Sequence, residues 1–356
     1  MQFFSFVLGA TLAPWDMDWV AQQFERGQPP NELFPHWPTN YTGGVNPIPC
    51  HSHNDYWRDV PLFSALRAGC IGVEADVWLF GDELFIGHDA SSLALHRTLK
   101  TLYIQPLLEI LDNRNPQSPQ PGGLEVLNGV FDTVPSQTLV LLVDIKARGQ
   151  ETWPVLQEQL APLRDRGYLT YFNGTNVIER PITVVGTGRT PYELLVKNSS
   201  YRDIFFDAPL DRLGGLNVQG AGPTIEDDPN YDIEQHVHAY LSDWSNESKE
   251  SSIDGVSDTV QHGGVERIAP YDTTNSYYAS ASFKKAVGFP FGFRITNKQR
   301  RLIREQVHKA HERGLKARYW STPGWPRILR HHVWRVLIEE GVDVLNIDDL
   351  RSPIEK

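Results

Sequence analysis

The stretch IGVEADVWLFGDELFIGHD, from Ile71 to Asp89, decides how we interpret the rest of the chain. Its first half, Ile71 to Leu79, is apolar and rich in residues that favour a buried strand. Glu74 and Asp76 stand two residues apart, so the alternation of a strand turns both carboxylates to the same face. Buried carboxylates are costly unless a cation or hydrogen bonds meet them. The stretch therefore predicts a cation site on this strand.

The second half of the stretch returns the chain toward those carboxylates. Asp82 marks a turn, and Glu83 to Ile86 is predicted to be a short returning strand. His88 and Asp89 follow it, which brings an imidazole back to the acidic end of the first strand. We interpret the whole stretch as a metal site with a titratable base beside it.

The length and composition fit one large domain. The chain has 356 residues, of which 40% are hydrophobic, and an α/β barrel of this length is commonly a single domain. We expect an N-terminal extension over residues 1–44, followed by one catalytic domain over residues 45–356 with a polar insertion around residues 210–257. The net charge of -11 argues against general affinity for nucleic acid.

The charge is unevenly distributed along the sequence. Glu226 to Asp272 is strongly acidic, whereas Lys284 to Arg335 holds many Lys and Arg residues with little acid between them. Such a basic segment forms either the solvated outer face of helices, which we favour, or a face for a phosphate-bearing substrate or an anionic membrane.

Cysteine usage and the N-terminus bear on the cellular compartment. Cys50 and Cys70 are too few for a disulfide framework, and although a single bridge is conceivable, we favour buried free thiols. Phe3 to Ala13 has the length and the small-residue ending of a signal-peptide core but lacks a basic leader. No segment reaches the ~18 apolar residues of a spanning helix. Glycosylation motifs begin at Asn40, Asn173, Asn198 and Asn246, and they slightly favour a secreted or membrane-associated protein.

Strands and helices alternate along the chain. The predicted strands are Val45–His53, Ile71–Leu79 with its returning strand, Thr138–Ile145, Ile182–Val185, Ile204–Phe206, Tyr277–Phe283, Leu315–Trp320 and Val342–Ile347. The predicted helices are Leu62–Ala68, Leu102–Leu111, Leu124–Phe131, Thr152–Arg166, Tyr192–Lys197, Asn297–Arg313 and Arg327–Glu339. Eight strands interleaved with helices predict an α/β fold, the (β/α)8 or TIM barrel.

In such a barrel the residues at the carboxyl ends of the strands converge on one cavity. In chain order these residues are His51, His53, Asn54, Glu74, Asp76, His88, Asp144, Lys146, Asp207, Tyr319, Trp320, Asp348 and Asp349. We interpret Asp207, Asp348 and Asp349 as helix caps or loop acids, and Trp320 as an aromatic lid.

The remaining groups suit phosphoryl chemistry. Glu74, Asp76 and Asp144 offer the hard oxygen ligands that Mg²⁺ or Ca²⁺ prefers. One histidine after the first strand and His88 would act as base and acid, because displacement at phosphorus needs a proton removed on one side and supplied on the other. Lys146 would hold a phosphate oxygen, or it forms a simple ion pair with Asp144 at the end of the strand.

Several motifs match a known superfamily. They are HSHNDYW from His51, VEADVWL from Val73, GHD ending at Asp89, RTLKTLYIQPLLEIL from Arg97, ARYWSTPGWP from Ala317 and LNIDDL from Leu345. With these motifs, the chain resembles the PLC-like phosphodiesterase superfamily, which includes glycerophosphodiester phosphodiesterases and sphingomyelinase D enzymes. The resemblance spans nearly everything from Cys50 to Leu350 and implies a TIM barrel.

The resemblance also implies roles for individual residues. Glu74, Asp76 and Asp144 correspond to the ligands of the divalent metal, Mg²⁺ or Ca²⁺. His88 corresponds to the second catalytic histidine, Lys146 to the lysine of an Asp-x-Lys pair, and Trp320 to a substrate-side tryptophan near the end of the seventh strand. The first catalytic histidine stays open, since one alignment favours His53 with Asn54 as a metal ligand and another favours His51.

We therefore expect a metal-dependent phosphoric diester hydrolase that acts on a phospholipid or a glycerophosphodiester by histidine acid–base catalysis. The expected contacts include a membrane surface and exclude nucleic acid, and mitochondrial association is a further option. One alternative is a catalytically silent barrel that serves as a membrane-associated or interaction protein. Another is a zinc hydrolase built on His51 and His53, but the fifth and sixth predicted strands supply no histidine, and we interpret His236 and His238 as surface residues.

Overall fold

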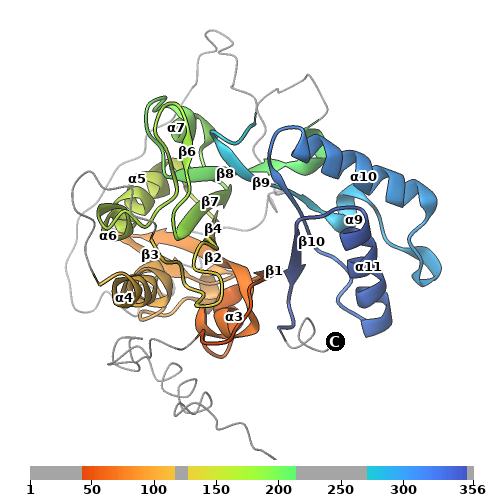
Figure 1. Ribbon diagram of the computed structural model, residues 1–356, viewed down its shortest axis with the longest axis horizontal. Coiled ribbons are helices and arrows are strands. Elements are labelled where there is room, and N and C mark those ends of the chain that lie inside the picture. Colours follow the sequence, from red (N-terminus) through yellow and green to blue (C-terminus); the bar gives the residue numbers. More distant parts are fainter. Residues whose placement is uncertain (1–41, 117–126, 214–270, 351–356) are drawn as a thin grey trace, which may run out of the picture.

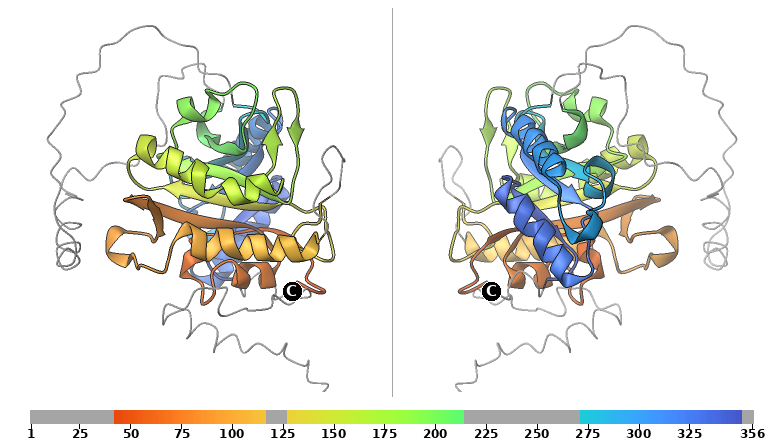
Figure 2. Two further views of the ribbon diagram at one scale, coloured as in Figure 1. Left: turned by 90° about the vertical axis from the view of Figure 1, so that its left-hand side faces the viewer. Right: turned by 90° about the vertical axis from the view of Figure 1, so that its right-hand side faces the viewer.

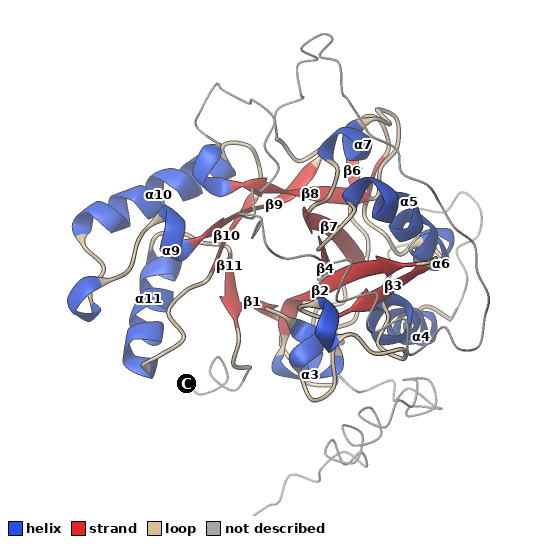
Figure 3. Ribbon diagram, turned by 180° about the vertical axis from the view of Figure 1, so that it is seen from behind, coloured by secondary structure: helices blue, strands red, loops and turns tan. Residues whose placement is uncertain are grey.

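The computed structural model describes residues 42–116, 127–213 and 271–350. Within them, eight parallel strands close into a barrel that helices surround (Figure 3), and this confirms the predicted (β/α)8 fold. Around the barrel the strands are β1 (Ile48–Ser52), β11 (Val344–Ile347), β10 (Lys316–Trp320), β9 (Ser276–Ser282), β8 (Ile204–Pro209), β7 (Ile182–Gly188), β4 (Leu139–Ile145) and β2 (Cys70–Phe80). The pairing of β1 with β2 closes the ring.

Two further pairings lie beside the barrel. The predicted returning strand is β3 (Glu83–Ile86), which pairs antiparallel with the outer part of β2. A small hairpin of β5 (Tyr171–Phe172) and β6 (Val177–Ile178) was not predicted, because each of its strands has only two residues.

The helices cover the outside of the ring. Figure 1 shows α9, α10 and α11 together on one side and α3 to α7 on the other. In chain order they are η1 (Asp55–Trp57), α3 (Phe63–Ala68), η2 (Ala90–Ser92), η3 (Lys100–Ile104), α4 (Gln105–Arg114), α5 (Gly149–Gln159), α6 (Ala161–Asp165), α7 (Tyr192–Val196), η4 (Leu210–Arg212), α9 (Phe283–Ala286), η6 (Phe291–Phe293), α10 (Asn297–His311) and α11 (Arg327–Glu339).

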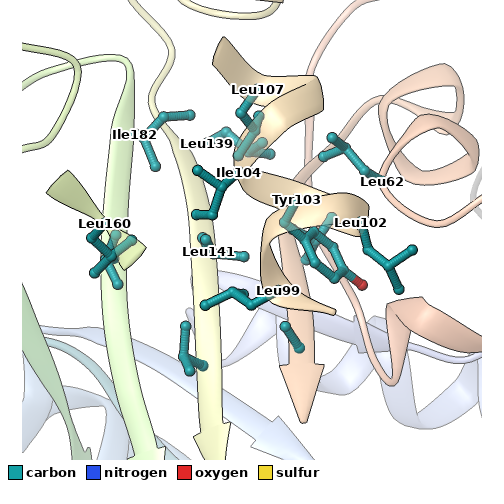
Figure 4. Packing of buried hydrophobic residues seen from close by; sticks show 14 of the residues in the cluster. Leu62, Leu99, Leu102, Tyr103, Ile104, Leu107, Leu139, Leu141, Leu160 and Ile182 are labelled. Atoms are coloured by element: carbon teal, nitrogen blue, oxygen red, sulfur yellow. The ribbon is translucent and has the colours of Figure 1, made fainter. Parts of the chain in front are cut away.

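The largest hydrophobic cluster lies between the barrel and these helices. Figure 4 shows Leu102, Tyr103 and Leu107, from the turn and helix η3–α4, close to Leu139 and Leu141 on β4. All of these side chains are at most 1% exposed. Fully burying one such side chain contributes about 1.5 to 3 kcal/mol, so this layer fixes the strands that carry the site.

Inside the barrel, the side chains of β4 change from apolar to acidic along the strand. Val140 and Leu142 on β4 pack with Val185 and Val344 in a small internal apolar cluster. Two residues further along β4 the inward position is Asp144, which lies beside Asp76 on β2 in the parallel register. The same alternation thus places apolar residues in the barrel and acids at its carboxyl end.

Two predicted helices differ from the structure. The segment Thr152–Arg166 contains two helices, since α5 ends at Gln159 and α6 begins after Leu160. Residues 127–131 of the predicted helix Leu124–Phe131 are not helical, and residues 124–126 lie outside the described part. Most of the polar insertion and of the N-terminal extension, with Phe3–Ala13, Asn40, His236, His238 and Asn246, also lie outside it. None of the helices in the described part is long and apolar enough to cross a membrane.

The expectation of free thiols is wrong. Cys50 on β1 and Cys70 at the start of β2 form a disulfide, and their Cα atoms lie 4.7 Å apart. The two strands pair in parallel, which brings the cysteines within the range that a disulfide spans. The bond ties together β1, which carries His51 and leads to His53, and β2, which carries Glu74.

We predict that replacing both cysteines by alanine lowers the free energy of unfolding by about 3 kcal/mol, because the bond closes a loop in the unfolded chain. The bonded residues are 20 positions apart. Urea denaturation with and without reductant measures the difference. Reductant should leave the double variant unchanged, and an equally small effect of reductant on the native sequence would contradict the prediction.

Candidate metal centre and acid–base site

Three carboxylates meet at the carboxyl end of the barrel. Glu74 and Asp76 come from β2 and Asp144 from β4, and one oxygen atom of each lies within 4.8 Å of the others. Asp76 is completely buried and Glu74 is 6% exposed. The predicted metal ligands are therefore brought together by strand alternation and by the register of two neighbouring strands.

The electrostatics of this cluster favour a cation. Burial raises the pKa of Glu74, and the nearby charges of Asp76 and Asp144 raise it further, against the opposing effects of His53 and Arg318. Burial likewise raises the pKa of Asp144, with Lys146 acting in the opposite direction. Buried acids that repel one another are stabilised as anions by a divalent ion.

The donor atoms fit such an ion. Oδ1 of Asp76 and Oδ1 of Asp144 are buried and have no hydrogen-bond partner among the described residues. A Cβ atom on Gly188 would lie 1.9 Å from Oδ1 of Asp144, so a glycine at that position leaves room for the carboxylate. Two unpaired, buried carboxylate oxygens beside Glu74 are the hard ligands that Mg²⁺ or Ca²⁺ takes.

Lys146 bridges two of the acids. Its Nζ lies 2.6 Å from Oδ2 of Asp144 and 2.7 Å from Oδ2 of Asp76. Burial opposes the charged form, but the two carboxylates outweigh it and raise the pKa of Lys146 above its ordinary value. The lysine is therefore a fixed positive charge at the edge of the cluster, and it orients the oxygens that it does not bind.

The hairpin of β2 and β3 delivers His88 to the cluster. The amide of Gly87 donates to the carbonyl of Asp76 over 3.2 Å, and the Trp78 indole donates to the carbonyl of Gly87 over 2.8 Å. Nδ1 of His88 consequently lies 3.4 Å from Oδ2 of Asp76, while the side chain remains about half exposed. The imidazole thus combines contact with the acids and access to solvent.

Tyr56 is a site residue that the sequence reasoning missed. Its hydroxyl lies 2.7 Å from Oδ2 of Asp76, 2.8 Å from Oδ1 of Asn54 and 3.3 Å from Nδ1 of His88. Burial and the charge of Asp76 raise the pKa of Tyr56, so the hydroxyl stays protonated and donates. The sequence feature that could have identified Tyr56 is its place within the HSHNDYW motif. Only the histidines and the asparagine of that motif were interpreted as site residues.

Asn54 enters the site through both its backbone and its side chain. Its φ of 47° is left-handed, a conformation that asparagine adopts more readily than most residues. The amide nitrogen donates to Oε2 of Glu74 over 3.4 Å, and Oδ1 accepts from Tyr56. Asn54 therefore borders the carboxylates.

The two candidate first histidines occupy different environments. Nε2 of each lies 3.9 Å from Oε2 of Glu74. His51 is completely buried, neither of its ring nitrogens has a hydrogen-bond partner among the described residues, and burial with the charge of Arg318 lowers its pKa well below the ordinary value. The side chain of His53 is 25% exposed.

His53 is held by an acid that directly follows the last strand. Its Nδ1 lies 2.6 Å from Oδ1 of Asp348. Burial lowers the pKa of His53, but the hydrogen bond to Asp348 and the charge of Glu74 outweigh burial and raise it overall. Arg58 links the backbone at these two residues, because it donates hydrogen bonds to the carbonyls of His53 and Asp348.

The interpretation of the three remaining acids as helix caps or loop acids is wrong for Asp207 alone, because Asp348 and Asp349 lie in the loop after β11. Asp348 orients His53, and Asp349 lies 3.5 Å from Arg330. Asp207 is a buried residue within β8, and its Oδ2 accepts from Arg318 over 3.4 Å. Acids at strand ends were judged singly from the sequence, whereas their partners come from distant strands.

Arg318 was also missed. It is 2% exposed inside the barrel and donates to Ser280 and Asn346 as well as to Asp207. Its charge lowers the pKa of Glu74 and Asp144 relative to burial alone. A charged residue in the middle of the strand sequence KARYW is as costly to bury as Glu74, and this signal could have identified it. Trp320, at the end of the same strand, is 39% exposed.

Comparison with known proteins assigns the family. Residues 39–207 match the AIM6-like phosphodiesterase domain. The chain is 37% identical to the "altered inheritance of mitochondria protein 6 homolog" of Arthroderma benhamiae over 323 residues, which cover 89% of this chain and 86% of the relative. The chain belongs to this family.

A yeast relative is also similar to the chain. Altered inheritance of mitochondria protein 6 of Saccharomyces cerevisiae is 32% identical over 313 residues, which cover 86% of this chain and 70% of the relative. No solved structure matches the chain. The family confirms the resemblance to phosphodiesterases that the motifs indicated, and the matched domain includes Glu74, Asp76 and Asp144.

We predict that Mg²⁺ or Ca²⁺ raises the melting temperature of this family member, because an ion that binds only the folded state stabilises it. Glu74→Gln and Asp144→Asn should each abolish the shift while the protein remains folded. Asp82→Asn, which changes an exposed acid in the β2–β3 turn, is the matched control and should keep the full shift. An undiminished shift in Glu74→Gln would contradict the assignment.

Proposed function

We propose that this protein is a divalent-metal-dependent phosphoric diester hydrolase that acts on a phospholipid or a small phosphodiester. The observation that carries the proposal is the cluster of Glu74, Asp76 and Asp144 with one histidine against each end. His53 contacts the cluster at Glu74, and His88 contacts it at Asp76. The phosphodiesterase family supports the same reaction class.

In this proposal the three carboxylates hold Mg²⁺ or Ca²⁺, with Asn54 at their border. The ion, when bound, supplies neutralising charge to the non-bridging oxygens of the phosphate. Lys146 and Arg318 place further positive charge beside the cluster, which favours an anionic substrate. Trp320 offers an aromatic surface at the rim for the organic part of the substrate.

His53 and His88 share the proton transfers. One removes the proton from the attacking hydroxyl group, which belongs to water or to a neighbouring part of the substrate, and the other supplies a proton to the leaving oxygen. An attack by the substrate's own hydroxyl would yield a cyclic phosphate. Asp348 holds the ring of His53, and Tyr56 with Asp76 holds the ring of His88.

We assign His51 a supporting role. Its complete burial and lowered pKa keep it neutral, and its ring packs edge-on against Tyr278 at 5.8 Å between centroids. A ring without solvent access is poorly suited to exchange protons with a substrate. In this proposal His51 packs against the site next to Glu74 and takes no part in proton transfer.

The alternatives are less well supported. A zinc hydrolase would need a set of nitrogen ligands, but among the described residues the only group of three or more candidate ligands close to one another consists of carboxylates. A catalytically silent barrel would have no need for three metal ligands, two histidines in contact with them and the buried Arg318 in one site.

For the compartment, we propose an oxidising environment at the cell surface or along the secretory route. The disulfide supports this proposal, because such bonds persist where the environment is oxidising. The names of the relatives refer to the inheritance of mitochondria, and they support mitochondrial association as the second candidate.

The proposal predicts turnover that ³¹P NMR can detect. Sphingomyelin, lysophosphatidylcholine and glycerophosphocholine are each incubated with the protein in Mg²⁺ and in chelator. A new, metal-dependent phosphorus resonance is expected for at least one of them, and its chemical shift distinguishes a cyclic phosphate from a monoester. Metal binding in the absence of any turnover across phospholipids and soluble diesters would contradict the proposal.

The proposal also predicts unequal effects at the two neighbouring histidines. His53→Ala and His88→Ala should each lower kcat by about a hundredfold or more, because each removes an acid–base group. His51→Ala should keep a larger part of kcat and mainly lower stability. Steady-state kinetics on the substrate found by NMR provide the measurement, and a loss of kcat confined to His51→Ala would reverse the assignment.

A further inference from the structure

Several large hydrophobic side chains are exposed at one end of the molecule. Trp57 is 58% exposed, Phe293 57%, Trp320 39%, Trp325 83% and Ile328 82%. Trp57 follows β1, Phe293 lies between β9 and α10, and the other three lie between the end of β10 and the first turn of α11. These positions all follow the carboxyl ends of strands, which is the end of the barrel that carries the carboxylates.

The segments that carry these residues form one surface. The amide of Ile295 donates to Nε2 of His332 over 3.3 Å, which ties the β9–α10 connection to α11. Ile295 and Leu329 also share a buried cluster. Figure 2, right, shows α10 and α11 side by side. Trp57 lies at the site itself, because its ring centroid is 5.1 Å from that of His88.

The same surface is positively charged. Residues 283–304 and 320–335 contain no Asp or Glu, although the whole chain has a net charge of -11. The exposed Lys and Arg residues there without an ion pair among the described residues are Lys284, Lys285, Arg294, Lys298, Arg301, Arg327 and Arg335. Arg300 and Arg304 pair with Glu339 and Glu340. Exposed aromatic residues among lysines and arginines are typical of surfaces that bind anionic lipids.

We propose that these two segments, together with Trp57, form a membrane-binding face that seats the mouth of the barrel on an anionic phospholipid bilayer. The basic residues are attracted to the lipid head groups, while Trp325 and Ile328 insert between them. The choice of a bilayer over a protein partner rests on the proposed function, since a phospholipid substrate must reach Glu74 and His88 from a membrane. A face of this kind also overcomes the repulsion between a negatively charged protein and a negatively charged surface.

Vesicle cosedimentation of the full chain tests the inference. The vesicles contain phosphatidylcholine alone or with about one third phosphatidylserine. Chelator is present, so that binding is measured without hydrolysis of the lipid. We expect binding to the anionic vesicles only. Trp325→Ala combined with Ile328→Ala should weaken it by about tenfold or more. The matched control is Ile338→Ala, because Ile338 is 60% exposed at the other end of the same helix.

The charge contribution is tested separately. Lys284→Gln combined with Lys285→Gln should weaken binding by about tenfold and reduce its dependence on salt, because each cation near the surface adds to the attraction. Failure of the native sequence to bind anionic vesicles would overturn the inference. An equal loss of vesicle binding in Ile338→Ala would also overturn it. So would the finding that the protein forms a dimer in the absence of vesicles and that the Trp325→Ala and Ile328→Ala changes dissociate this dimer.

The two proposals fail in distinguishable ways. Turnover of glycerophosphocholine without any vesicle binding would overturn the membrane-binding face and leave the hydrolase intact. Vesicle binding without turnover of any diester would overturn the hydrolase alone.

Discussion

The burial of Glu74, Asp76 and Asp144 at one end of a barrel is the constraint on which the rest of the site depends. Three acids within 4.8 Å of one another repel, and burial adds to the cost of keeping them ionised. Cations and hydrogen-bond donors from several strands offset that cost. Lys146 follows β4, Arg318 comes from β10 and Tyr56 follows β1, so the chemistry of the cluster requires the whole ring to close.

Both halves of the chain contribute residues to the site. The family model covers residues 39–207, which contain the carboxylates, Lys146, His53 and His88. The later strands add the groups that orient and balance them, namely Arg318 on β10 and Asp348 after β11. The relatives align over nearly the whole chain, in agreement with a site that both halves complete. The disulfide between β1 and β2 ties the two strands that carry the first ligands and the first histidines.

The site could be predicted from the sequence where local periodicity determines geometry. Glu74 and Asp76 share a face because a strand alternates, and His88 returns because β3 is short. The strand order followed from eight repeats of one pattern. Contacts between distant strands left no such local signal. The hydrogen bond from His53 to Asp348 and the contacts of the buried Arg318 depend on strands that are far apart in the sequence. The pairing of Cys50 with Cys70 depends on the parallel pairing of β1 with β2. The expectations for these residues, made one residue at a time, were therefore wrong or missing.

The most direct test of the account is the position of a bound metal ion. Crystals of the protein grown with Mn²⁺ as a substitute for Mg²⁺ would be measured for anomalous scattering. The account predicts one strong peak among Glu74, Asp76 and Asp144, with the unpaired oxygens of Asp76 and Asp144 as ligands. A fully occupied peak elsewhere, or none at a saturating concentration of Mn²⁺, would contradict it.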